Sequence, residues 1–252
     1  MVMEIVRFEK IFKKYNEQGK GQTLVLNDIN FSVNKGEFIA ILGPSGCGKS
    51  TLLNLLAGFD TEYEGSVYVN GQKVTESNHE CVSVFQDHGL LPWRNVIDNV
   101  KLGLEFRGDN ERAQEDISLD YIDLVGLKHV KYKNISELSG GMQQRVAIAR
   151  ALAVGPKILL LDEPFGALDE MMRLKLGKDL LHIWQEEKIT IFFVTHNIDD
   201  AIYLADRIFV MGSDPGHIKE IINVNIQRPR RLTNEAFGRI KKRILNLFNI
   251  ND

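Results

Sequence analysis

Cysteine is scarce in this chain, and its sequence has no long apolar run. The cysteines among the 252 residues are Cys47 and Cys81, and their spacing is not that of a metal site. A disulfide framework is therefore not expected, and a reducing cytosol is the natural environment. No apolar segment approaches the ~20 residues that span a bilayer, and the N-terminus has no signal-peptide pattern. If the protein works at a membrane, we expect another chain to cross it.

An excess of positive charge is also missing. The formal net charge is -3, whereas proteins that bind the nucleic-acid backbone are usually basic, so no nucleic-acid partner is expected. Hydrophobic residues make up 44% of the chain and charged residues 26%, which is typical of a folded globular protein. The length is sufficient for a large core in one domain, alone or with a subdomain.

One stretch has the pattern of a phosphate-binding loop. A short apolar run ends at Gly43, an apolar run of helical character begins after Ser50, and G-x-x-x-x-G-K-S lies between them. The glycines let the backbone wrap around phosphate groups, and the helix N-terminus favours an anion. Lys49 is predicted to reach the β- and γ-phosphates, and Ser50 to bind Mg²⁺. The predicted nucleotide site comprises Gly43, Pro44, Ser45, Gly46, Cys47, Gly48, Lys49, Ser50 and Thr51.

Two residues near this loop carry more specific expectations. Cys47 lies in an electropositive loop, which should lower the pKa of its thiol and make the thiol reactive. Tyr15 precedes the loop and has two open roles. It is either an edge aromatic that covers the core or a platform on which an adenine ring stacks.

The segments that flank the loop predict a β-rich layer. Strands are expected over 4–8 and 29–33, separated by a polar, flexible stretch over 16–22. Residues 65–70 alternate as in a strand, and Asn70-Gly71 is a strong hairpin signal.

A loop with two leucines and a tryptophan follows the next predicted strand, 81–85. The loop begins at Gln86 and includes Trp93, and its apolar residues either tuck under the surface or form a docking patch. Asn95 is the expected N-cap of a helix. Residues 95–138 have no strand pattern and are interpreted as an inserted helical subdomain.

A second helix start suited to an anion follows this block. Ser139 is a good N-cap, and Gly140 and Gly141 come directly after it. Two glycines in a first turn cost about 1 kcal/mol each relative to alanine. That cost indicates close approach of another group to this backbone.

Carboxylates and a histidine follow two predicted buried strands. The strand near 157–163 ends in Asp162 and Glu163. In a P-loop protein the first of these acids holds Mg²⁺, and the second is placed to orient or deprotonate the attacking water. His196 comes just after the strand at 189–194, at the end where open α/β sheets place their ligands.

The last predicted helix begins near Asn234. It has an apolar stripe at helical spacing, formed by Phe237, Ile240, Ile244, Leu247 and Phe248. The basic residues around it are interpreted as a solvated face, with weak attraction to anionic lipid as a remote alternative. They are Arg228, Arg230, Arg231, Lys241, Lys242 and Arg243.

Taken in order, these motifs resemble those of ABC-transporter ATPase subunits over nearly the whole chain. The matching segments are Gly43–Thr51, Gln86, Leu138–Arg145, Ile158–Glu163, Ala167-Leu168-Asp169 and His196. Within that superfamily, Gln86–Arg94 and Pro215–Ile218 are similar to the importers of nitrate, sulfonates, taurine and similar small anions. Asn197 stands where Asp is common, and Asp200 where Glu is common.

The resemblance implies an α/β fold: a P-loop NTPase (RecA-like) core with an antiparallel β subdomain and an inserted helical subdomain. The implied boundaries are 1–94 and 139–252 for the core with its β subdomain and 95–138 for the helical subdomain. It implies an ATPase that uses ATP and Mg²⁺ and powers a small-anion importer at the cytoplasmic face of a prokaryotic cell membrane. The alternatives are import of another small solute, such as a thiamine precursor or amino acid, or a non-transport ABC ATPase.

The resemblance also implies partners and residue roles. Two copies would pair head to tail, so that Ser139, Gly140 and Gly141 contact ATP held by the other copy and Asp169 bridges the two. Membrane-spanning permease subunits would dock near Gln86–Trp93, and a solute-binding protein would act indirectly. Gln86 would sense Mg²⁺ and the attacking water. Glu163 would be the base, Asp162 and Ser50 would bind the metal, and His196 would contact the γ-phosphate.

Overall fold

A computed structural model describes residues 3–17, 21–85, 87–166 and 168–250 of the chain. The chain divides into two compact units. The first unit is formed by Met1–His79 together with Thr190–Asp252, and the second by Glu80–Ile189.

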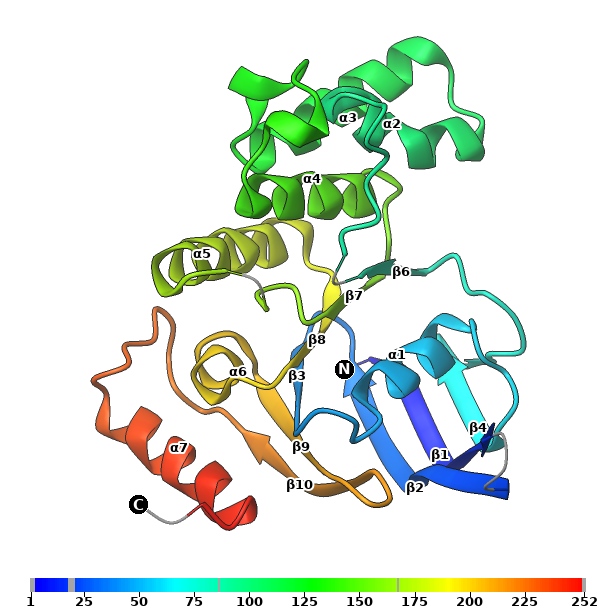
Figure 1. The fold of residues 1–252 in the computed structure, drawn as a ribbon, viewed down its shortest axis with the longest axis vertical. Helices are drawn as coiled ribbons and strands as arrows, with labels where there is room; N and C mark the ends of the chain where they lie inside the picture. The colour runs from blue at the N-terminus through cyan, green and yellow to red at the C-terminus, as the bar shows by residue number, and fades with distance from the viewer. Residues whose placement is uncertain (1–2, 18–20, 86, 167, 251–252) are drawn as a thin grey trace. The chain divides into compact units, whose positions relative to one another are not determined.

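Four strands of the first unit form an antiparallel sheet in the order β2-β1-β4-β5 (Figure 1). Along β2, Ile29, Phe31 and Val33 are buried and alternate with exposed residues, as expected of a sheet with one face in the core. Phe31 stacks on Phe8 of the neighbouring strand, with ring centroids 4.5 Å apart. The strands are β1 (Glu4–Glu17), β2 (Gly21–Asn34), β4 (Glu64–Val69) and β5 (Gln72–Lys73).

The strands β1 and β2 are longer than the segments 4–8 and 29–33 that the sequence predicted. The polar stretch over 16–22 was expected to be flexible, but β1 continues to Glu17 and β2 begins at Gly21. Residues 18–20 lie outside the described part of the chain. Cross-strand pairing overrides the low strand propensity of these polar residues. The predicted hairpin at Asn70-Gly71 is confirmed, since both residues have positive φ, 49° and 75°.

The first unit also contains strands that are buried along their whole length. β3 (Phe38–Leu42) lies between β8 (Thr190–Thr195) and β9 (Arg207–Gly212) and is parallel to both. β10 (His217–Asn223) pairs antiparallel with β9. Every residue of β3 and β8 is buried, which explains their continuous apolar sequences. The helices of this unit are α1 (Lys49–Ala57), α6 (Ile198–Leu204) and α7 (Glu235–Leu247).

One predicted surface cation is buried. Arg230 is only 5% exposed, so the expectation of a solvated basic face is wrong at this position. Burial lowers the pKa of its guanidinium to about 10. The charged side chain can be buried because its N–H groups donate to backbone carbonyls, several of which lie at the end of α6. It donates to the backbone carbonyls of Ile202, Tyr203, Ala205, Val224 and Ile226.

The second unit combines a parallel strand pair with helices. β6 (Cys81–Val84) and β7 (Ile158–Asp162) pair in parallel. Asn95 caps α2 by accepting a 2.9 Å hydrogen bond from the Asp98 amide, as predicted. The helices are α2 (Val96–Arg107), α3 (Glu111–Leu124), α4 (Gly140–Ala153) and α5 (Glu170–Glu187), with 3-10 turns at Lys128–Val130 and Ile135–Glu137.

Candidate nucleotide site

The predicted phosphate-binding loop connects β3 to α1 in the first unit. Pro44, Ser45 and Gly46 are exposed. Gly46 and Gly48 have φ of 81° and 92°, a left-handed backbone conformation that favours glycine. Gly48 occupies the N-cap position of α1 and has no side chain to accept a hydrogen bond from the first turn. The first turn also contains no acidic residue. The helix start therefore offers uncapped amides and a positive dipole end to an anion.

Lys49 is buried at the base of this loop and is 5% exposed. Its Nζ donates hydrogen bonds of 3.0 Å to the Gly43 carbonyl and 2.9 Å to the Pro44 carbonyl. A buried ammonium is stable only when its donors find acceptors. The Gly43 and Pro44 carbonyls thus hold the Lys49 ammonium in the loop, where the P-loop pattern predicted a lysine for phosphate binding.

Cys47 does not have the reactive thiol that the sequence predicted. The side chain is 1% exposed, and burial raises the pKa of its thiol. The charge of Lys49 lowers the pKa but does not overcome the burial. A thiol buried among apolar groups stays protonated and inert.

Tyr15 lies at the edge of the same unit and is 38% exposed. The Lys13 ammonium sits 4.5 Å from the centroid of its ring, so one face is occupied by a cation. The pKa of the phenol is raised by burial and by Asp60, while the Thr51 hydroxyl of α1 lowers it. Tyr15 is therefore brought close to the P-loop helix.

His196 follows β8 at the same edge as the loop. Leu42, the last residue of β3, is the register partner of Thr195, and the two strands are parallel. Gly43 and His196 therefore leave neighbouring strands at one end, and the His196 side chain is exposed. Asn197 caps α6 by accepting 3.0 Å from the Asp200 amide, so Asn in place of the commoner Asp keeps the cap.

The predicted carboxylates lie in the second unit, at the end of β7. Asp162 and Glu163 are both half-buried. Glu163 has a φ of 47°, in the left-handed region that costs a non-glycine residue energy. The turn is held by a 3.1 Å hydrogen bond from the Gly166 amide to the Glu163 carbonyl. Strain of this kind concentrates at functional sites.

Ser139 and Asp169 begin neighbouring helices of the second unit. The Ser139 hydroxyl accepts from the Met142 amide at 3.4 Å, and Asp169 Oδ1 accepts from the Met172 amide at 2.9 Å. A side chain on Gly141 would meet Met172 Cε at 2.7 Å, whereas one on Gly140 would meet no described atom within 4 Å. Met172 Cε is the end of a flexible side chain and can move aside, so packing among the described residues gives neither glycine a strict steric reason.

Gln86 and Ala167 lie outside the described residues, and the loop after Gln86 is described from Asp87 onward. Its leucines are half-buried, in line with the tucked alternative, whereas Trp93 is 75% exposed. Two residues that the sequence reasoning missed hold it in place: Asn99 exchanges hydrogen bonds with the Leu91 backbone, and Arg150 donates to the His88 and Gly89 carbonyls. The available sequence signal for Asn99 was an asparagine set among apolar residues of a predicted helix, and in the structure this side chain is fully buried.

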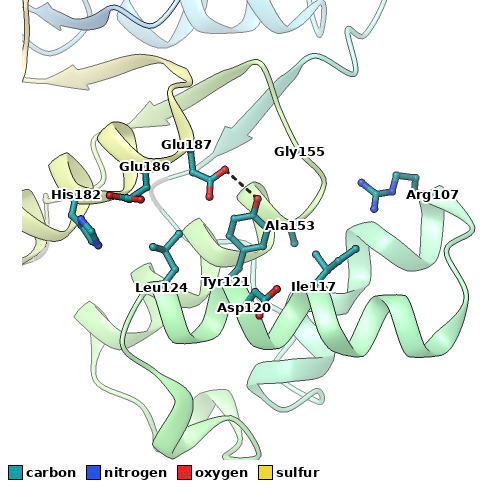
Figure 2. Close-up of a pocket in the computed structure, with 10 residues that line it drawn as sticks. All are labelled: Arg107, Ile117, Asp120, Tyr121, Leu124, Ala153, Gly155, His182, Glu186 and Glu187. Carbon is teal, nitrogen blue, oxygen red and sulfur yellow. Dashed lines mark hydrogen bonds between the residues drawn. The ribbon is translucent and has the colours of Figure 1, made fainter.

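A separate cavity of about 750 Å³ opens among α3, α5 and the end of α4 (Figure 2). Tyr121 donates a 3.2 Å hydrogen bond to Glu187 there, and burial together with that carboxylate raises the pKa of the phenol to about 12. None of the residues predicted for the nucleotide site lines this cavity.

Comparison with known proteins identifies the family. Residues 26–166 match the model of the ABC transporter family. The chain belongs to this family of ATP-binding proteins. An aliphatic sulfonates import ATP-binding protein of Bacillus cereus is 42% identical over 243 residues, 96% of this chain and 95% of the relative. A nitrate import ATP-binding protein of Synechococcus elongatus is 44% identical over 214 residues, 84% of this chain and 78% of the relative.

A solved structure agrees with this assignment. A dimeric ATP-binding cassette in a post-hydrolysis state, bound to ADP and phosphate, aligns with a TM-score of 0.77 at 31% identity and covers 88% of this chain and 100% of its own. The predicted ABC ATPase fold is confirmed. As a member of this family, the protein binds and hydrolyses ATP. Within the described residues, no helix is both long and apolar enough to cross a bilayer.

Proposed function

We propose that this ABC ATPase powers the import of a small anion, such as nitrate, a sulfonate or taurine. The observation that carries the proposal is the identity of 42% and 44% to ATP-binding proteins named for sulfonate and nitrate import, over most of each chain. In this proposal the protein works at the cytoplasmic face of a prokaryotic cell membrane. It acts with permease subunits and, indirectly, with a solute-binding protein.

Phosphate binding is assigned to the P-loop, Gly43–Thr51. On ATP binding, Lys49 exchanges its two loop carbonyls for the β- and γ-phosphates, so its charge is already in place. The Gly48 turn offers backbone N–H groups with no side-chain cap in competition. Tyr15 presents to adenine the ring face that Lys13 leaves uncovered.

Mg²⁺ is assigned to Ser50, Asp162 and Gln86. The donors fit, because hydroxyl, carboxylate and amide oxygens are the ligands that this hard cation prefers. Among the described residues no cluster of three His, Cys, Asp or Glu could hold a metal alone. The bound ion supplies positive charge to the phosphate oxygens.

Hydrolysis is assigned to Glu163 as the base for the attacking water and to His196 as a contact of the γ-phosphate. The left-handed backbone of Glu163 at the end of β7 supports this role, because such strain fixes where a carboxylate projects. His196 is exposed beside the P-loop strand, at the edge where a γ-phosphate is expected.

The catalytic pocket is proposed to be shared between two copies paired head to tail. Gly140 has open space where a side chain would lie, although glycine weakens the start of α4. A nucleotide bound by the partner would use that space, with Ser139 and Gly141 beside it and Asp169 bridging the copies. The dimeric state of the similar cassette supports this arrangement.

Mixing two inactive variants tests the shared pocket. Lys49→Ala lacks the P-loop cation and Gly140→Trp fills the open space at α4, so each homodimer has two defective sites. A mixed head-to-tail dimer has one intact site, and ATPase activity should reappear on mixing. An unchanged sum of the two residual activities would contradict the proposal. The matched control is Gly238→Trp, because Gly238 is exposed and a Cβ there would meet no described atom within 4 Å.

Permease docking is assigned to the surface around Trp93. Trp93 and Tyr132 are 75% and 66% exposed, and a backbone bridge between Asn95 and Asn134 joins their segments. Exposed aromatic residues on a loop held by backbone and side-chain hydrogen bonds suit an apolar helix of a membrane-spanning subunit. Uptake of labelled nitrate, taurine and an alkanesulfonate by cells that lack this gene identifies the cargo. Normal uptake of all three would reject small-anion import.

A further inference from the structure

The turn between β9 and β10 is bonded directly to β2. The Asn27 amide donates a 2.8 Å hydrogen bond to the Gly216 carbonyl, and the Gly216 amide donates 2.9 Å to the Val25 carbonyl. Gly216 also forms a parallel bridge with Leu26. His217 closes the turn, since its Nδ1 lies 2.8 Å from the Pro215 carbonyl oxygen and must carry the donated proton. The position of Gly216 is thus fixed by hydrogen bonds that both its amide and its carbonyl form with the β2 backbone.

Gly216 lies against the backbone of the P-loop. A Cβ on this residue would lie 2.2 Å from the Cys47 carbonyl oxygen and 2.8 Å from the Val25 carbonyl oxygen. Both neighbours are backbone atoms, which cannot move aside as the end of a flexible side chain can. The φ of Gly216 is not in the left-handed region, so its glycine is required by close approach and not by backbone conformation.

This contact orients the peptide between Cys47 and Gly48. In a trans peptide the carbonyl and the following N–H point in opposite directions. Because the Cys47 carbonyl faces the β9–β10 turn, the Gly48 N–H points away from the turn. Leu26 supports the next residue from β2, since a side chain on Gly48 would meet Leu26 Cδ2 at 2.6 Å.

We propose that Gly216 is a positioning residue for ATP binding: by letting the β9–β10 turn pack on the Cys47 carbonyl, it directs the Gly48 amide toward the phosphates. The inference rests on the proposed role of the P-loop. A methyl group at residue 216 must displace either the turn or the Cys47–Gly48 peptide, and in both cases the amide loses its support.

Gly216→Ala tests the proposal, with Gly238→Ala as the matched control, because a Cβ at Gly238 would meet no atom of the described residues within 4 Å. The dissociation constant of ATP is measured calorimetrically without divalent cations, at a temperature where each nucleotide-free variant is fully folded. Gly216→Ala should raise it at least tenfold and Gly238→Ala less than twofold. A purely structural role would lower the thermal midpoint and leave the dissociation constant of the folded protein unchanged. An unchanged constant in Gly216→Ala overturns the inference.

Two further variants keep the test decisive. Lys49→Ala is measured in parallel, and loss of ATP affinity there but not in Gly216→Ala rejects the role of Gly216 while leaving the P-loop proposal intact. Unchanged affinity in both rejects the P-loop proposal itself. If Gly216→Ala does not fold, His217→Ala should weaken ATP binding at least threefold, and His217→Asn, whose amide can still donate to Pro215, should restore it. Equal affinity in all three His217 forms would overturn the inference.

Discussion

Tyr15 donates a 2.7 Å hydrogen bond from its phenol to Asp60 Oδ2. The other carboxylate oxygen of Asp60 accepts 2.7 Å from the ammonium of Lys13, which is only 2% exposed. Lys13 also covers one face of the Tyr15 ring. An ion pair between buried Lys13 and half-buried Asp60 therefore orients the aromatic ring that we assign to adenine stacking. A change in this pair should alter both the free energy of unfolding and the affinity for nucleotide.

Asp60→Asn should destabilise the protein at neutral pH. Burial opposes ionisation of Asp60, but hydrogen bonds from Lys13 and Tyr15 prevail and lower its pKa. A carboxyl with a lowered folded pKa contributes stability above its unfolded pKa and loses it as pH falls through the folded value. Removing the partner of buried Lys13 costs about 3 kcal/mol. Urea unfolding should therefore show that loss at pH 7, and a much smaller one only when the pH is below the lowered folded pKa of Asp60. Asp123→Asn, which breaks a surface pair with Lys128, should cost under about 0.5 kcal/mol at both pH values.

Glu163→Gln should bind ATP and dimerise but hydrolyse ATP about 10²–10⁴-fold more slowly, because the amide cannot take a proton from water. Single-turnover hydrolysis separates this loss from any change in binding. Glu186→Gln, at an exposed acid on α5, should leave the rate unchanged. Near-normal turnover in Glu163→Gln would refute the role of this residue as the base.

Lys49→Ala should lower ATP affinity by about 10- to 100-fold, since a hydrogen bond to a charged group contributes about 1.5–3 kcal/mol. Titration with ATP measures the loss. Lys73→Ala, at an exposed lysine on β5, is the control. Equal affinities of wild-type and Lys49→Ala protein would remove this lysine from the phosphate site.

Neither cysteine should react with a thiol reagent in the folded protein at neutral pH. Burial raises the pKa of Cys47, and burial raises that of Cys81 to about 12, so both thiols stay protonated and inaccessible. Ellman's reagent should detect no rapid thiol before denaturation and two thiols after it. Rapid modification of Cys47 that ATP prevents would restore the reactive-thiol prediction.

Trp93→Ala should change the free energy of unfolding by under about 0.5 kcal/mol, because the side chain is largely exposed. Intrinsic ATPase activity should persist while copurification with the permease is lost. Phe106→Ala, at another highly exposed aromatic, should leave assembly intact. Normal assembly of the Trp93→Ala protein would return the loop to a purely structural role.

The P-loop, the caps at Asn95 and Ser139 and the hairpin at Asn70-Gly71 could be predicted because each depends on a few adjacent residues. The errors concern residues whose state depends on distant neighbours. Arg230 was expected in solvent but is buried against carbonyls of α6, and the short α6 itself was not predicted. The low pKa expected for the Cys47 thiol was based on the electropositive loop and left out the burial of the thiol, which raises the pKa.

The sequence by itself determined the chemistry of this protein: motif residues at set spacings specify a loop for phosphates, a strand that ends in two acids and a helix start suited to an anion. Tertiary structure alone decided what supports these groups. It placed Gly216 against Cys47, more than 160 residues away along the chain, and closed Lys13, Tyr15 and Asp60 into one network. The reason is physical: local patterns encode backbone conformation, whereas burial and close contact arise only when distant strands pair.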